Sequence, residues 1–82
     1  MKEFLEYVLR QLVEFPEEVI VVELPRDKSV VFRIQARQTD IGKIIGAHGR
    51  TIAALRNLLS AAASRTDRKA HIEILEERPP AR

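Results

Sequence analysis

All three glycines of the chain lie within eight consecutive positions, at Gly42, Gly46 and Gly49. Glycine is the residue type that most readily adopts positive φ and lets the backbone lie close to a ligand. Two basic residues, Lys43 and Arg50, flank the turn that the last two glycines enclose. A turn without side-chain bulk, next to a helix N-terminus and to cations, is suited to binding a phosphate backbone.

Helices are expected on both sides of this turn. Apolar residues recur at helical spacing before and after it, at Ile41, Ile44, Ile45, Ile52, Leu55 and Leu59. We predict a short helix over residues 41–45, for which Thr39 and Asp40 offer N-terminal capping side chains. A longer helix is predicted over residues 50–65, which contain neither glycine nor proline. We assign Gly42 to close helix packing rather than to ligand contact.

The rest of the sequence supplies one helix and three strands. Apolar residues at helical spacing over residues 4–13 predict an amphipathic helix, which Pro16 ends. Residues 19–24 and 30–36 are rich in β-branched residues, and the turn residues between them predict a hairpin. Alternation over residues 70–75 predicts the last strand. The expected order is α-β-β-α-α-β, which is an α+β fold class.

Positive charge is concentrated around the glycine turn. The chain has a formal net charge of +2, but residues 37–69 carry seven basic residues and two acidic ones. Residues 1–36 carry five basic and seven acidic residues. This asymmetry is expected if the half that contains the turn faces a polyanion, although a solvated basic helix surface would give the same pattern.

The composition argues against catalysis. A chain of 82 residues forms one domain, whose core is too small to enclose a large active site. It has no cysteine, its only histidines are His48 and His71, and it lacks the P-loop and nucleophile signatures. His71 and Glu73 share a strand face, but such pairs are usually ordinary polar residues rather than metal ligands. We therefore expect no catalytic residue, metal or cofactor, and a cytoplasmic protein without a membrane segment.

A family resemblance rests on residues 44–52, which read Ile-Ile-Gly-Ala-His-Gly-Arg-Thr-Ile. This run resembles the KH-domain signature, Ile/Val-Ile-Gly-x-x-Gly-x-x-Ile, and the element order resembles that of the type II, prokaryotic variant. The resemblance covers nearly the whole chain, and it is to the small bacterial stand-alone KH proteins of the KhpA type, described as RNA-binding. It implies one type II KH domain over residues 1–76, with a three-stranded sheet covered by helices. A flexible polar tail would follow at 77–82.

The resemblance also implies a site for single-stranded RNA, because the Gly-x-x-Gly loop of KH domains clamps about four nucleotides. The expected RNA-binding residues are Lys43, Ile44, Ile45, Gly46, Ala47, His48, Gly49 and Arg50. The glycines would let phosphates approach closely, whereas Ala47 and His48 occupy positions at which many KH domains carry Lys or Arg. One of the two isoleucines would form an apolar floor for the bases, and the other would enter the core.

Two further features bear on how bases could be read. Val31, Arg33 and Gln35 alternate on one face of the second strand, where they either reach base edges or form the outer face of the sheet. The chain has four aromatic residues, Phe4, Tyr7, Phe15 and Phe32. None is near the turn in sequence, so a stacking platform of the RRM or OB type is not expected.

A DNA-binding helix-turn-helix protein is one alternative, because it also joins two helices through a turn that contains glycine. Its second helix would need side chains that read bases. Residues 51–55 are mostly apolar or small instead, which favours packing over groove reading.

A protein-interaction module is the other alternative. On the predicted helix over residues 50–65, apolar residues cover an arc that is roughly twice the ~100° required for one buried face. Ala54, Leu58 and Ala61 are therefore either enclosed by the domain or form a dimer interface, through which two weak RNA sites would act by avidity. The KhpA-type resemblance implies self-association, pairing with a second, larger KH-domain protein, and a role as an RNA chaperone or post-transcriptional regulator.

Overall fold

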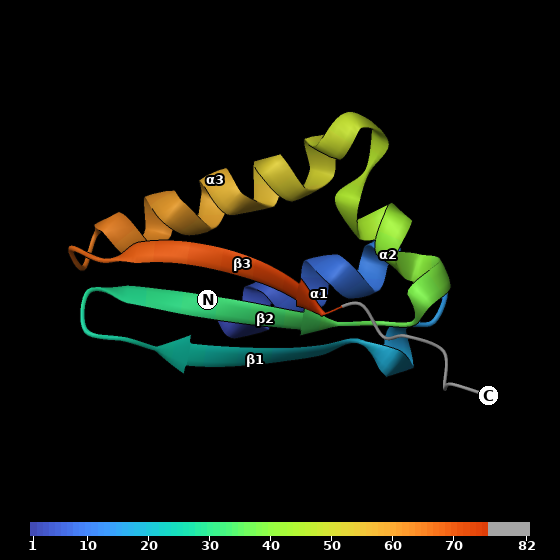
Figure 1. Cartoon of the computed structure of the whole chain (residues 1–82), viewed down its shortest axis with the longest axis horizontal. Coiled ribbons are helices and arrows are strands. Elements are labelled where there is room, and N and C mark those ends of the chain that lie inside the picture. Colours follow the sequence, from blue (N-terminus) through green and yellow to red (C-terminus); the bar gives the residue numbers. More distant parts are fainter. Residues whose placement is uncertain (76–82) are drawn as a thin grey trace.

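The helices and strands follow the predicted order. A computed structural model describes residues 1–75, so the expected domain end at residue 76 and the expected tail at 77–82 lie outside the described residues. The elements are α1 (Lys2–Leu12), β1 (Ile20–Pro25), β2 (Ser29–Gln35), α2 (Gln38–Ile45), α3 (Arg50–Ser64) and β3 (Lys69–Leu75), as drawn in Figure 1. Short 3₁₀ turns cover Pro16–Glu18 and Ala47–Gly49.

The three strands form one mixed sheet with the order β1-β2-β3. β1 and β2 are antiparallel, as the predicted hairpin requires, and the Arg26 N–H closes their turn by donating to the Ser29 carbonyl at 2.7 Å. β2 and β3 are parallel, with Phe32 opposite Ile72 and Ile34 opposite Ile74. A parallel pair needs a long crossover, which α2 and α3 supply.

One face of the sheet forms the core. Val30, Phe32 and Ile34 of β2 are fully buried, whereas the residues that alternate with them are only half-buried. α1 lies behind the sheet in Figure 1 and α3 runs along β3. α1 buries Leu5 and Leu9 in the same cluster. From α3 the cluster receives Leu55, Leu59 and Ala63. Each large side chain buried in this way stabilises the fold by roughly 1.5–3 kcal/mol.

Asp40 has a different position from the one predicted. α2 begins at Gln38 rather than Ile41, and among residues 1–75 no side chain caps its N-terminus. Asp40 is fully buried, and its carboxylate accepts hydrogen bonds from the backbone N–H groups of Glu14 and Phe15 at 3.1 and 3.0 Å. The prediction of Thr39 and Asp40 as capping residues is therefore wrong. The Asp40 side chain instead ties the segment after α1 to α2.

Arg37 makes a second connection at the start of α2. Its guanidinium lies 3.8 Å from the centre of the Phe15 ring and donates hydrogen bonds to the Glu18 carboxylate. These hydrogen bonds hold the pKa of Glu18 below its usual value, because they favour the charged carboxylate. Together with Asp40, Arg37 fixes the helix that leads into the glycine turn against the connection between α1 and β1.

Candidate nucleic-acid interface

The turn between α2 and α3 requires backbone conformations that glycine adopts most easily. Gly46 has φ 80° and ψ 169°, and Gly49 has φ 72° and ψ 16°. His48 between them also has a positive φ, of 58°. The Gly46 N–H donates to the Gly42 carbonyl at 2.8 Å, which ends α2, and the Gly49 N–H donates to the Gly46 carbonyl at 3.0 Å. The two glycines of the predicted turn thus stand where the backbone reverses.

The three glycines differ in the space around them. A Cβ at Gly46 would lie 2.3 Å from Thr51 Oγ1 and 2.9 Å from the Thr51 nitrogen, so the first turn of α3 packs directly against Gly46. A Cβ at Gly49 or at Gly42 would meet none of the described atoms within 4 Å. The prediction that Gly42 permits close helix packing is therefore wrong, since no described atom of a neighbouring element lies near the position that a Cβ would take.

The side chains around the turn are exposed and carry positive charge. Lys43, Ala47, His48 and Arg50 are all exposed, and the turn lies at the outer end of the two helices in Figure 1. None of Lys43, His48 and Arg50 forms an ion pair or a side-chain hydrogen bond with another described residue. Their donors and charges are thus available to a ligand at the turn.

The two isoleucines before the turn have different environments. Ile44 is 0% exposed and belongs to the core, so it cannot contact a ligand directly. Ile45 is half-buried against the edge of the core. The sequence left open which isoleucine would form the apolar floor and which would enter the core; because Ile44 is in the core, only Ile45 can form the floor.

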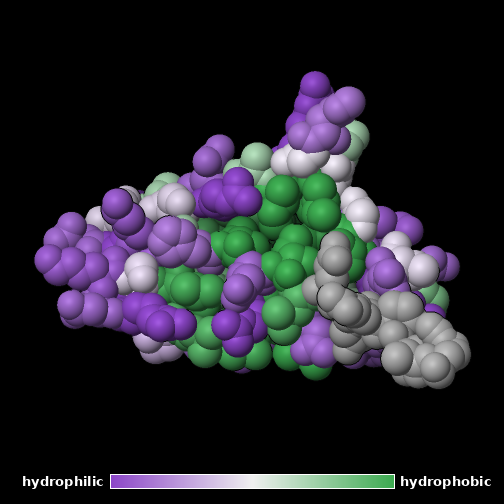
Figure 2. All heavy atoms as spheres, viewed as in Figure 1, coloured by the Kyte–Doolittle hydropathy of each residue, from purple (hydrophilic) through white to green (hydrophobic). Residues whose placement is uncertain are grey.

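Further half-buried isoleucines extend this apolar surface. Ile52 lies in the first turns of α3, and Ile72 and Ile74 lie on the core face of the edge strand β3. Figure 2 shows a hydrophobic surface between α3 and β3, below a hydrophilic tip. The alternation of Ile72 and Ile74 was visible in the sequence. Their place beside α3 follows from the parallel pairing of β3, which local patterns do not reveal.

The residues on the other face of β2 lie away from this surface. Val31, Arg33 and Gln35 are on the sheet face opposite the helices, and Arg33 Nε donates to Glu73 Oε1 at 2.8 Å. The structure therefore selects the outer-face alternative for these residues over base reading at the turn. Glu73 is held by this pair, while His71 is exposed on the same face.

The apolar stripe of α3, which we define as Ala54, Leu58 and Ala61, is not enclosed by the domain. All three residues are exposed, and Leu58 is 55% exposed. The opposite side of α3 faces the sheet and is buried. Of the two alternatives given by the sequence, the structure excludes enclosure and leaves an apolar surface on the outside of the helix.

Membrane and metal sites are not found among the described residues. No helix within residues 1–75 has both the length and the apolar character needed to cross a bilayer. Within the same residues, no group of three or more His, Asp or Glu side chains could hold a metal ion.

The geometry favours an unpaired nucleic acid strand. Close backbone approach at Gly46 and Gly49 and the nearby cations suit phosphates, whereas the half-buried isoleucines suit the faces of unpaired bases. A duplex would present its phosphates but keep its bases stacked inside.

Known proteins resemble this chain over most of its length. The family model described as "KhpA/KhpB, KH domain" matches residues 2–74. An "RNA-binding protein KhpA" of Chlamydia trachomatis is 47% identical over 95% of this chain and 100% of its own. One of Thermotoga maritima is 48% identical over 74% and 81% of the two chains, and one of Listeria monocytogenes is 33% identical over 93% and 100%. No solved structure matches the chain.

Proposed function

The chain belongs to the KhpA/KhpB KH-domain family, and we propose that it is a non-enzymatic protein that binds single-stranded RNA at its glycine turn. Its element order and three-stranded sheet are those of a type II KH domain, as the resemblance implied. The observation that carries the proposal is the turn itself, with two glycines at positive φ beside basic side chains that have no partner among the described residues.

In this proposal the turn holds the RNA backbone and the isoleucines hold the bases. Phosphates approach the backbone at Gly46 and Gly49, which carry no side chain of their own, and Lys43 and Arg50 supply charge. The bases then lie on the half-buried surface that begins at Ile45. Such a site takes about four nucleotides. Because it lacks aromatic stacking partners, we expect modest affinity and a salt dependence that reflects only a few phosphates.

A site of this size suits a protein that contacts many transcripts briefly. We propose that the protein acts in a bacterial cytoplasm as an RNA chaperone or post-transcriptional regulator. The family membership supports this role.

The apolar stripe of α3 supports a further proposal, that the protein pairs with a second copy or with a larger KH-domain protein. Leu58 and its alanine neighbours are exposed on a charged domain, and soluble proteins use most such patches for contacts. Two RNA sites in one assembly would raise the overall affinity without any new contact to RNA.

The RNA-binding proposal is tested by placing negative charge at the turn. The double variant Ala47→Asp/His48→Asp should fold normally, because both side chains are exposed and Asp tolerates the positive φ of position 48. We expect its affinity for a labelled single-stranded RNA to fall at least about tenfold, or ~1.4 kcal/mol, through repulsion of phosphates. Fluorescence anisotropy measures the affinity, and circular dichroism checks the fold.

The matched control is Tyr7→Glu/Gln11→Glu, which adds the same charge at two exposed positions of α1. This control should bind RNA nearly as well as the parent protein. Equal loss in both variants would attribute the effect to net charge and remove the turn from the site.

A competition titration separates this proposal from the helix-turn-helix alternative. The apolar stripe on the exposed side of α3 cannot hydrogen-bond to base edges, so single-stranded RNA should compete better than a duplex of equal length. Preference for duplex DNA would contradict the proposed site.

A further inference from the structure

A second basic surface lies at the end of the sheet opposite the glycine turn. It is an open groove of about 690 Å³ between the β1–β2 turn and the α3–β3 turn. We call it the distal groove. Its charged lining consists of Arg26, Lys28, Arg68 and Lys69, with Asp27 and Asp67.

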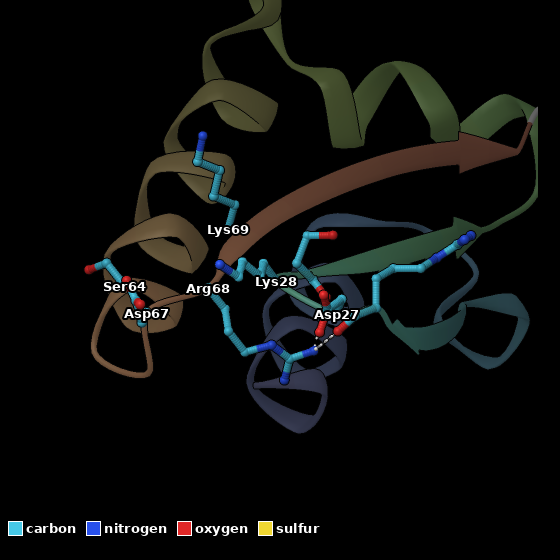
Figure 3. A pocket seen from close by; sticks show the side chains of 8 residues that line it. Asp27, Lys28, Ser64, Asp67, Arg68 and Lys69 are labelled. Atoms are coloured by element: carbon cyan, nitrogen blue, oxygen red, sulfur yellow. Dashed lines mark hydrogen bonds between the residues drawn. The ribbon is translucent and has the colours of Figure 1, made fainter.

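Backbone and side-chain contacts join the two turns that form the distal groove. Arg68 Nη2 donates to the carbonyls of Arg26 and Ser29 at 3.1 and 2.9 Å, and dashed lines mark these bonds in Figure 3. The Lys69 N–H donates to the Lys28 carbonyl at 3.1 Å. Residues that lie about 40 positions apart in the sequence are thereby held together. Arg68 positions the groove, and the lysine side chains remain outside these bonds.

The lysines of the distal groove differ from the cations of α1 and of the outer sheet face. On α1, Lys2 and Arg10 both lie within salt-bridge distance of Glu6. On the outer sheet face, Arg33 pairs with Glu73. Lys28 and Lys69 are exposed and form no ion pair with another described residue. In this respect they resemble the cations at the glycine turn.

The separation of the two basic surfaces follows from α3, which runs from one to the other. Its 15 residues correspond to a length of about 22 Å at ~1.5 Å per residue. At the ~3.4 Å rise of a stacked strand, an RNA bound at the turn needs about seven more nucleotides to cover that distance. A strand of about 12 nucleotides can therefore reach both surfaces, whereas four nucleotides cannot.

We propose that the distal groove binds the phosphate backbone of the RNA strand whose other part is held at the glycine turn. The inference rests on the proposed function, because it assigns a second contact to the same ligand. Lys28 and Lys69 supply the charge, and neither reads a base. The groove thus makes binding depend on RNA length rather than on sequence.

The test compares RNA of two lengths with a charge-neutralising variant. Lys28→Gln/Lys69→Gln removes two charges from the distal groove while retaining the backbone hydrogen bond between these residues. Lys2→Gln/Arg10→Gln is the matched control, because it removes two charges from α1. Each protein is titrated by fluorescence anisotropy with a single-stranded RNA of 4 or 12 nucleotides at several salt concentrations, and circular dichroism confirms that each is folded.

For the 12-nucleotide RNA, the slope of log K against log salt should be smaller by about 1.4 in the groove variant, since each lost phosphate contact removes ~0.7. Raising the salt from 50 to 200 mM should then reduce the affinity of the variant by a factor about seven times smaller than the factor for the parent protein. The α1 control should keep the parent slope. For the 4-nucleotide RNA, all three proteins should behave alike.

An unchanged 12-nucleotide slope in the folded groove variant would overturn the distal groove as an RNA contact. An equal change in the α1 control would also overturn it, because the effect would then come from net charge. Failure of the parent protein to bind either RNA would contradict the proposed function itself. The two surfaces make distinct contacts if the Ala47→Asp/His48→Asp variant loses binding while the groove variant binds the 4-nucleotide RNA normally.

Discussion

Alanine at Gly46 should destabilise the protein much more than alanine at Gly49, although both glycines have positive φ. At Gly46, the combination of φ 80° and ψ 169° is essentially restricted to glycine and costs another residue about 1–3 kcal/mol. A Cβ there would also lie 2.7 Å from Thr51 Cβ and 2.9 Å from the Thr51 nitrogen. Overpacking of this kind typically costs ~1–3 kcal/mol more. We therefore expect Gly46→Ala to lower the free energy of unfolding by roughly 2–6 kcal/mol.

At Gly49 only the backbone conformation opposes alanine. Its φ of 72° and ψ of 16° are left-handed helical values, which cost an L-residue about 1–2 kcal/mol, and a Cβ there meets none of the described atoms within 4 Å. The free energies of unfolding are measured by urea denaturation followed by circular dichroism. Equal destabilisation by the two substitutions would refute the steric argument.

A second substitution tests which atoms oppose the Cβ at Gly46. Thr51→Ala removes Oγ1, the nearest atom at 2.3 Å, but keeps the Cβ and backbone nitrogen of residue 51. In the Gly46→Ala background it should therefore restore only part of the lost stability. Full restoration would mean that the hydroxyl alone causes the clash.

Three other predictions follow from the same structure. Asp40→Ala should lower the free energy of unfolding by about 3 kcal/mol in urea denaturation, because two backbone N–H groups lose a charged acceptor. A loss below ~1 kcal/mol would contradict this role of Asp40. Asp67→Gly should raise the free energy of unfolding by about 0.5 kcal/mol, because glycine adopts the φ of 60° at residue 67 without strain. A lower melting temperature of this variant would contradict the prediction. Leu58→Glu should convert a dimeric parent protein into a folded monomer in light scattering, and a parent that is monomeric at high micromolar concentration would refute the interface.

Local sequence patterns were sufficient to predict the element order and the turn. Helical spacing, β-branched runs and the glycine positions each act through neighbouring residues, and the structure confirms the hairpin and the glycine turn. These patterns do not show why each position needs glycine. Gly46 and Gly42 look alike in the sequence, but only Gly46 has Thr51 packed against it.

Tertiary contacts account for what the sequence did not reveal. Asp40 looked like a helix cap because Asp is common there, yet its partners are Glu14 and Phe15, about 25 positions earlier in the chain. Likewise, the distal groove joins two turns that are far apart in the sequence. The parallel pairing of β3 determines both the position of this groove and the isoleucine surface below the glycine turn.

An NMR titration of the ¹⁵N-labelled protein with a four-nucleotide single-stranded RNA shows directly whether RNA binds at the glycine turn. If RNA binds there, the largest shifts of amide signals occur at residues 43–52 and at Ile72 and Ile74. Amides of α1 should change little. Shifts concentrated on the outer sheet face, around Val22 and Arg33, with the signals of residues 46–50 unchanged, would contradict RNA binding at the glycine turn.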